Sequence, residues 1–164
     1  QYSYLNLVNM LNIPLLIIFS PIWGRRIART SWFKTLYFSM GFYLLHYCGL
    51  AFVTRETLLY LFPLSMVFAF IFAPGINIAF CNIPYINIPE KNQTNYIGFY
   101  SAMINLAAFA GAAFGKEFIK HTEGVNINIL GAAMQNKQYI LFVTAAAMLV
   151  SVFSIKMLQR RTQG

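Results

Sequence analysis

The chain has 164 residues, of which 59% are hydrophobic and only 10% are charged, and its formal net charge is +8. Soluble domains usually carry about 25% charged residues, and even a domain of about 150 residues buries only about 70% of its surface. The composition therefore excludes an ordinary soluble domain and predicts an integral protein of the lipid bilayer. The basic residues stand in short gaps between apolar segments and form no continuous stripe, so we expect no nucleic-acid partner.

Five apolar segments are each close to the length of about 20 residues that a helix needs to cross a bilayer. They are predicted at 4–23, 33–53, 58–82, 96–115 and 138–157. Their apolar residues are continuous and do not alternate as the strands of an outer-membrane barrel do. The sequence therefore predicts an all-α, polytopic transmembrane helix bundle with five spans.

The first predicted helix carries asparagines at three-residue spacing, Asn6, Asn9 and Asn12, on one broad face. Polar side chains inside a bilayer usually face a water-filled cavity or a neighbouring helix. Asn9 and Asn12 are therefore candidates for the wall of a solute cavity, and the alternative is that their amides bridge to neighbouring helices. Pro14 follows them and predicts a bend, because proline lacks a backbone donor.

A basic cluster fills the gap after the first predicted helix, which reads PIWGRRIARTS. The residues of this motif are Gly24, Arg25, Arg26 and Arg29. We expect a short cytoplasmic loop here, with Gly24 making a tight turn at the helix end. Trp23 and Trp32 flank the cluster and are predicted to lie at the level of the lipid headgroups.

His46 lies near the middle of the second predicted helix, 33–53. Histidine can switch its charge near neutral pH, but we expect a structural hydrogen bond at this position. Cys48 and Cys81 lie in apolar segments without CxxC spacing or nearby ligands. They are predicted to be buried free thiols, and the sequence indicates no metal site and no cofactor.

Pro74 and Gly75 interrupt the third predicted helix, 58–82, and predict a bend. Interrupted helices often mark the binding sites of transporters, and the alternative is a static kink. Asn77 follows the pair directly and is a further cavity candidate.

The fourth predicted helix, 96–115, carries a stripe of small and polar residues that includes Ser101 and Asn105. Both are cavity candidates, and Asn105, near mid-depth, is the strongest. The stripe continues into a GxxxG match from Gly111 to Gly115, for which close helix packing is the favoured interpretation.

Charge is distributed unevenly between the two ends of the predicted bundle. Because successive spans alternate sides, the gaps 24–32 and 83–95 share one side with the C-terminal tail. When the residues at the span ends are included, that side holds eight basic residues and one acidic residue, a net charge of +7. The other side holds four basic and three acidic residues, a net charge of +1. The positive-inside rule places the first side, and the C-terminus, in the cytoplasm. Gln1 is then outside, so we expect N-terminal spans to be missing from the chain.

Three stretches of the sequence resemble motifs of a known family, and the sides of the membrane on which that family carries these motifs agree with the orientation predicted from charge. They are Pro21–Arg29, Asn82 with Pro89–Lys91 and Thr94–Gly98, and Gln138–Phe142. In this order they resemble the loop between helices eight and nine, the beginning of helix eleven and the beginning of helix twelve of a major facilitator superfamily (MFS) transporter. Ala28 stands where that loop usually carries an aspartate, so the charge contact that helps to lock the cytoplasmic side is absent.

This resemblance implies that the chain is the C-terminal half, helices eight to twelve, of a 12-helix MFS fold. Helices eight, ten and eleven would line the central pathway, and helices nine and twelve would face lipid. The missing N-terminal half of the same protein is the implied partner. The implied function is a secondary active transporter that moves a small solute by alternating access.

The candidate side chains offer amides and a hydroxyl rather than charges, which favours a neutral or amphipathic solute. The alternative is a non-transporting membrane scaffold or accessory subunit that associates through its small-residue helix faces. We expect no enzyme, since the sequence has no HExxH or GxSxG motif. The predicted location is the cell (cytoplasmic) membrane, with several spans and a cytoplasmic C-terminus.

Overall fold

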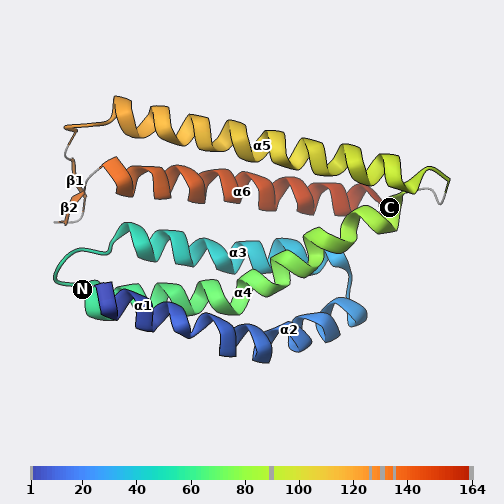
Figure 1. Cartoon of the computed structure of the whole chain (residues 1–164), viewed down its shortest axis with the longest axis horizontal. Helices are drawn as coiled ribbons and strands as arrows, with labels where there is room; N and C mark the ends of the chain where they lie inside the picture. Colours follow the sequence, from blue (N-terminus) through green and yellow to red (C-terminus); the bar gives the residue numbers. More distant parts are fainter. Residues whose placement is uncertain (1, 89–90, 126, 130–131, 135, 163–164) are drawn as a thin grey trace.

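The computed structural model describes residues 2–88, 91–125, 127–129, 132–134 and 136–162. Its long helices run side by side, and a small antiparallel hairpin lies between the last two of them in the chain (Figure 1). The elements, in chain order, are α1 (Tyr2–Met10), α2 (Asn12–Arg29), α3 (Trp32–Ala51), α4 (Leu58–Asn87), α5 (Gln93–His121), β1 (Ile127–Ile129), β2 (Ala132–Met134) and α6 (Asn136–Thr162).

Four helical stretches among the described residues are long and apolar enough to cross a membrane. They are Ser3–Arg29, which joins α1 and α2, Leu58–Tyr85, Gln93–His121 and Lys137–Arg160. The chain is therefore a helical, multi-pass membrane protein. Four of the five predicted segments correspond to these stretches, and the segment 33–53, which forms α3, is not among them.

The position of α3 in the bundle explains its composition. α3 lies between α4 and α6 and packs against both (Figure 1). Its buried side chains include the polar Thr35, Ser39 and His46. A helix that is surrounded by protein can carry polar side chains that would be costly against lipid. The MFS resemblance implied that this helix faces lipid, and in the structure it is the centre of the packing.

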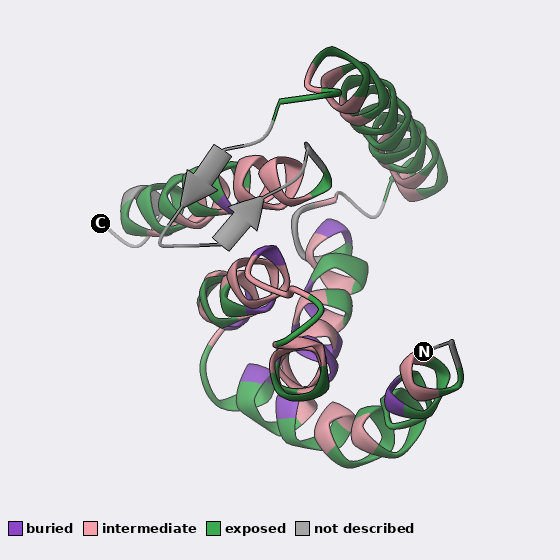
Figure 2. Cartoon of the chain, turned by 90° about the vertical axis from the view of Figure 1, so that its left-hand side faces the viewer, coloured by how far each residue is buried: buried purple, intermediate pink, exposed green. Residues whose placement is uncertain are grey.

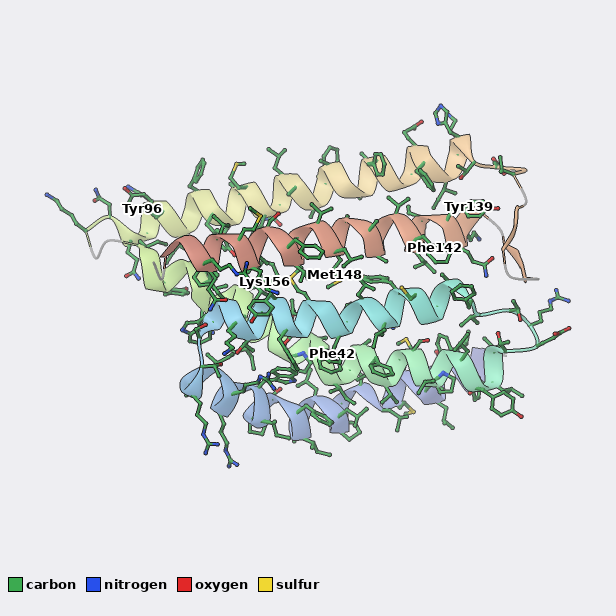
Figure 3. The ribbon with its side chains drawn as sticks, turned by 180° about the vertical axis from the view of Figure 1, so that it is seen from behind. Phe42, Tyr96, Tyr139, Phe142, Met148 and Lys156 are labelled. Atoms are coloured by element: carbon green, nitrogen blue, oxygen red, sulfur yellow. The ribbon has the colours of Figure 1, made fainter. Side chains whose placement is uncertain are left out.

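The core lies between α3, α4 and α6. Its buried residues are Leu36, Met40 and Ala79, against which residues of α6 such as Met148 pack. Figure 3 shows Met148 in the space between α6 and α3. Trp32, at the beginning of α3, is half-buried against the same core.

The basic cluster is helical and does not form a loop. α2 continues through Gly24 to Arg29, so the tight turn predicted at Gly24 is wrong. The helix ends only at Thr30, whose Oγ1 donates to the Arg26 carbonyl at 2.8 Å, and Ser31 Oγ accepts from Lys34 N at 3.1 Å to cap α3. Basic side chains suit the last turn of a helix because they complement its negative end. Hydropathy alone therefore placed the helix end too early.

The first span is interrupted three residues before Pro14. Leu11 separates α1 from α2, and its N–H donates to the Val8 carbonyl at 3.1 Å, one residue short of the α-helical pattern. Pro14 lies in the first turn of α2, where its missing N–H costs no intrahelical bond. The proline thus accompanies a break between two helices that continue in nearly the same direction (Figure 1).

α4 remains one helix through Pro74 but changes direction near its middle (Figure 1). Trp23 of α2 donates from Nε1 to the Ile71 carbonyl at 2.6 Å, which ties α2 to α4 at the bend. Gly75 lies so close to its neighbours that a Cβ there would be 2.5 Å from Ser39 Oγ and 2.8 Å from Trp23 Cδ2. Only glycine lets α2, α3 and α4 approach one another to this extent.

Large apolar side chains are exposed on the outer faces of the bundle, as lipid contact requires. In Figure 2 the exposed surface covers most of α5 and of the N-terminal helices. Examples are Leu7, Met10, Ile13 and Ile17 in the first span, Phe99, Leu106 and Phe109 in α5, and Val150 and Phe153 in α6.

The contact at Gly75 makes a prediction for stability. Gly75→Ala is expected to lower the free energy of unfolding in detergent by about 1–3 kcal/mol, since the added Cβ overpacks a tight site. Gly98→Ala is the matched control, because a Cβ at Gly98 would have no atom within 4 Å. We expect Gly98→Ala to keep or raise the thermal midpoint. Equal midpoints for the two variants would contradict the packing described at Gly75.

Candidate functional site

A groove between the C-terminal half of α4 and the N-terminal half of α5 is the candidate site. Its volume is about 520 Å³, within the range of about 300–1,000 Å³ that is usual for small-molecule pockets. Its lining residues are Asn77, Phe80, Cys81, Pro84 and Tyr85 of α4 and Ile97, Tyr100, Ser101 and Ile104 of α5.

Both walls of the groove follow helical spacing. On α4 the lining residues recur three, four, seven and eight positions after Asn77, and on α5 they recur three, four and seven positions after Ile97. Residues at these spacings share one face of a helix. One continuous face of each helix therefore forms one wall.

The groove exists because α4 and α5 diverge after their connection. α4 packs mainly on α3 and α2, and its bend carries its C-terminal half toward the beginning of α5 (Figure 1). α5 has no buried residue, and its main helix contact is with α6. Figure 2 shows α5 set apart from α4 over most of its length. The groove between the two helices is therefore not covered along one side.

The lining is uncharged, aromatic and moderately polar. The Tyr100 hydroxyl donates across the groove to the Phe80 carbonyl at 3.4 Å, which links the two walls. Among the described residues, neither the Asn77 amide nor the Ser101 hydroxyl has a side-chain hydrogen bond. These two groups remain available to a ligand.

The structure brings together two of the five predicted cavity residues. Asn77 and Ser101, which are distant in the sequence, line the same groove. Asn105 does not line it, and its amide Nδ2 donates to the Ser101 carbonyl of its own helix at 2.9 Å. Asn9 and Asn12 are exposed on α1 and at the beginning of α2. Neither of them lines the groove, because α1 and α2 pack on each other and on α4, and α2 also contacts α3.

The aromatic residues of the site, Phe80, Tyr85 and Tyr100, were not predicted from the sequence. They could have been recognised, since on each segment the aromatic residues lie at helical spacing from the candidate polar residues and so share a face with them. That spacing could not distinguish a groove from a packed interface. Only the divergence of α4 from α5 makes the difference.

His46 has the structural hydrogen bond that was predicted. It is buried, and its Nδ1 donates to the Ser65 carbonyl at 2.9 Å. Ser65 Oγ in turn donates to the Leu61 carbonyl at 2.7 Å, and Gly49 of α3 lies directly against the Ser65 side chain. The histidine therefore joins α3 to α4 at a close helix contact.

The two cysteines differ in their surroundings. Both are free thiols, Cys48 half-buried and Cys81 exposed. The prediction of a buried thiol is wrong for Cys81 because α5, which would have covered it in a closely packed pair, diverges from α4. The described residues contain no group of three or more His, Cys, Asp or Glu side chains placed to hold a metal ion.

The basic residues gather at one end of the bundle, where α2, α4 and α6 end and α3 and α5 begin (Figure 1). Figure 3 shows Tyr96 and Lys156 toward this end, and Tyr139 and Phe142 toward the other. The described basic residues of this end are Arg25, Arg26, Arg29, Lys34, Lys91, Lys156 and Arg160, and no described acidic residue is among them.

Arg26 is fixed in place by aromatic rings. Its guanidinium carbon lies 3.9 Å from the centre of the Phe38 ring and 5.6 Å from that of Trp23, a geometry that is favourable for a cation. Trp23 itself is buried between helices. Its indole is held by the Ile71 carbonyl and by neighbouring rings of Phe38 and Phe72.

Comparisons with protein-family models, with curated proteins and with solved structures found no match to this chain.

Proposed function

We propose that the chain is the C-terminal half of a secondary active transporter of the MFS type, which moves a small neutral or amphipathic solute by alternating access. The observation that carries this proposal is the uncharged α4–α5 groove, which Asn77 lines from α4 and Ser101 lines from α5. A groove beside a proline-bent membrane helix is the kind of place where transporters bind solutes.

Because the groove is open on one side, a further protein segment is needed to enclose a bound solute. A half-site bounded by two helices leaves much of a solute exposed, whereas ligand pockets usually bury most of the ligand surface. In the proposed transporter, an N-terminal half would close the groove. The residues involved on this side are Asn77 and Ser101, while Asn9, Asn12 and Asn105 remain candidates for contacts in other states of the transport cycle.

The collection of basic side chains at one end supports an orientation with that end, and the C-terminus, in the cytoplasm. Arg25 and Arg29 are exposed on the last turns of α2 at this end. The acidic residues of the described chain, Glu56, Glu117 and Glu123, lie at the opposite end.

A second candidate function is a membrane scaffold or accessory subunit. The observation that favours it is that α5 has no buried residue, and its exposed face includes Gly111, at which a Cβ would meet no atom within 4 Å. Small residues of this kind allow close approach of another helix. A stable stoichiometric complex with a second membrane protein, without solute uptake, would favour this function over transport.

Transport is tested with the full-length protein in energised membrane vesicles and a panel of radiolabelled uncharged solutes. Asn77→Ala is expected to lower uptake at subsaturating solute about fivefold, the equivalent of one net hydrogen bond. Asn82→Ala is the matched control, because Asn82 does not line the groove and donates to the Ile78 carbonyl of its own helix. Equal uptake by the two variants would remove the groove from the transport path.

Orientation is tested by cysteine labelling of intact cells in a variant whose native cysteines are replaced by serine. A maleimide that cannot cross the membrane is expected to label Glu123→Cys and to leave Arg25→Cys unlabelled until the cells are opened. Both positions are exposed, so accessibility within the protein does not limit either reaction. The reverse pattern would contradict the cytoplasmic assignment of the basic end.

A further inference from the structure

We propose that the α4–α5 groove binds an uncharged amphiphile with an aromatic ring. This inference deepens the proposed function by naming the class of solute, and it rests on that function for what happens to the ligand after binding. Two properties of the groove carry it: the charge of its lining, and the distribution of its rings and hydrogen-bonding groups.

The lining selects against a charged ligand. None of its residues is charged, and a charge that leaves water without a partner pays a large desolvation cost. The nearest basic residue in the sequence is Lys91, which is exposed and not part of the lining. A neutral ligand avoids this cost.

The rings of the lining favour a flat, unsaturated group. Phe80 and Tyr85 lie on the α4 wall, and Tyr100 lies on the α5 wall. Aromatic rings on two facing walls offer edge and face contacts to a third ring between them. The remaining apolar residues, Ile97 and Ile104, offer dispersion contacts to an alkyl chain.

The polar groups of the groove require a partner that can donate and accept hydrogen bonds. An amide and a hydroxyl without partners are costly in a membrane. Asn82 and Asn105 avoid the cost by donating to carbonyls of their own helices, at 2.7 Å and 2.9 Å. Asn77 and Ser101, one on each wall, have no such bonds among the described residues. A phenolic hydroxyl between them would supply both a donor and an acceptor.

The test uses Cys81 as a reporter, because it is exposed and lines the groove. The full-length protein is reconstituted in phosphatidylcholine vesicles with Cys48→Ser, and alkylation of Cys81 by N-ethylmaleimide is followed by mass spectrometry. The probe is 4-hexylphenol, with 4-hexylbenzoate as a charged probe of similar shape. At about ten times its dissociation constant, hexylphenol should slow the alkylation about tenfold, and hexylbenzoate should slow it much less.

Two kinds of control separate binding from a general effect of the probe on the membrane. Leu149→Cys, on the exposed face of α6, with both native cysteines replaced, should be alkylated at the same rate with and without hexylphenol. Asn77→Ala and Ser101→Ala should each weaken protection of Cys81 about fivefold, whereas the matched Asn82→Ala and Ser154→Ala should not. Gel filtration of each variant confirms that it is folded.

Each outcome has one meaning. Equal protection at positions 81 and 149, equal protection by the two probes, or no effect of Asn77→Ala and Ser101→Ala would overturn the inference. Protection of Cys81 with no solute uptake by the same protein would leave the binding site in place and remove the proposed function. Uptake of other neutral solutes without any protection by hexylphenol would keep the proposed function and remove this class of ligand.

Discussion

The close approach of three helices at Gly75 is the constraint on which the rest of the structure depends. Trp23 of α2 donates to the Ile71 carbonyl, and Gly75 leaves room for the Trp23 ring and for Ser39 of α3. Pro74 weakens the helical hydrogen bonds at the same level. The bend in α4 is thus held from outside by a side chain of another helix. Because the bend directs the C-terminal half of α4 toward α5, the groove depends on it.

The sequence predicted the helical part of the fold well, because continuous apolar runs and proline positions are local signals. It failed where the local signal was ambiguous. Hydropathy cannot distinguish a loop from a helix end that projects into water, so the turn was placed at Gly24 and not at Thr30. The sequence also did not indicate that Trp23 would be buried, since tryptophan is common both at the lipid headgroups and in protein cores.

The candidate site was only partly predictable, for a related reason. Asn77 and Ser101 could be selected singly, because a polar side chain in an apolar helix needs an explanation. That they share one groove, and that Asn105 does not, depends on how far α4 and α5 diverge. The divergence is a tertiary property, set by contacts of α4 with α2 and α3 and of α5 with α6.

Trp23 and Gly75 hold α4 in its bent form, and an electron-spin distance measured across the bend tests this role. Spin labels on Tyr60→Cys and Tyr85→Cys, which are exposed on either side of Pro74, would lie about 38 Å apart on a straight helix. If Trp23 holds the bend, the distance distribution is shorter and narrow, and it becomes longer and broader in Trp23→Phe. A distribution centred on the straight-helix distance, or one that Trp23→Phe leaves unchanged, would contradict it.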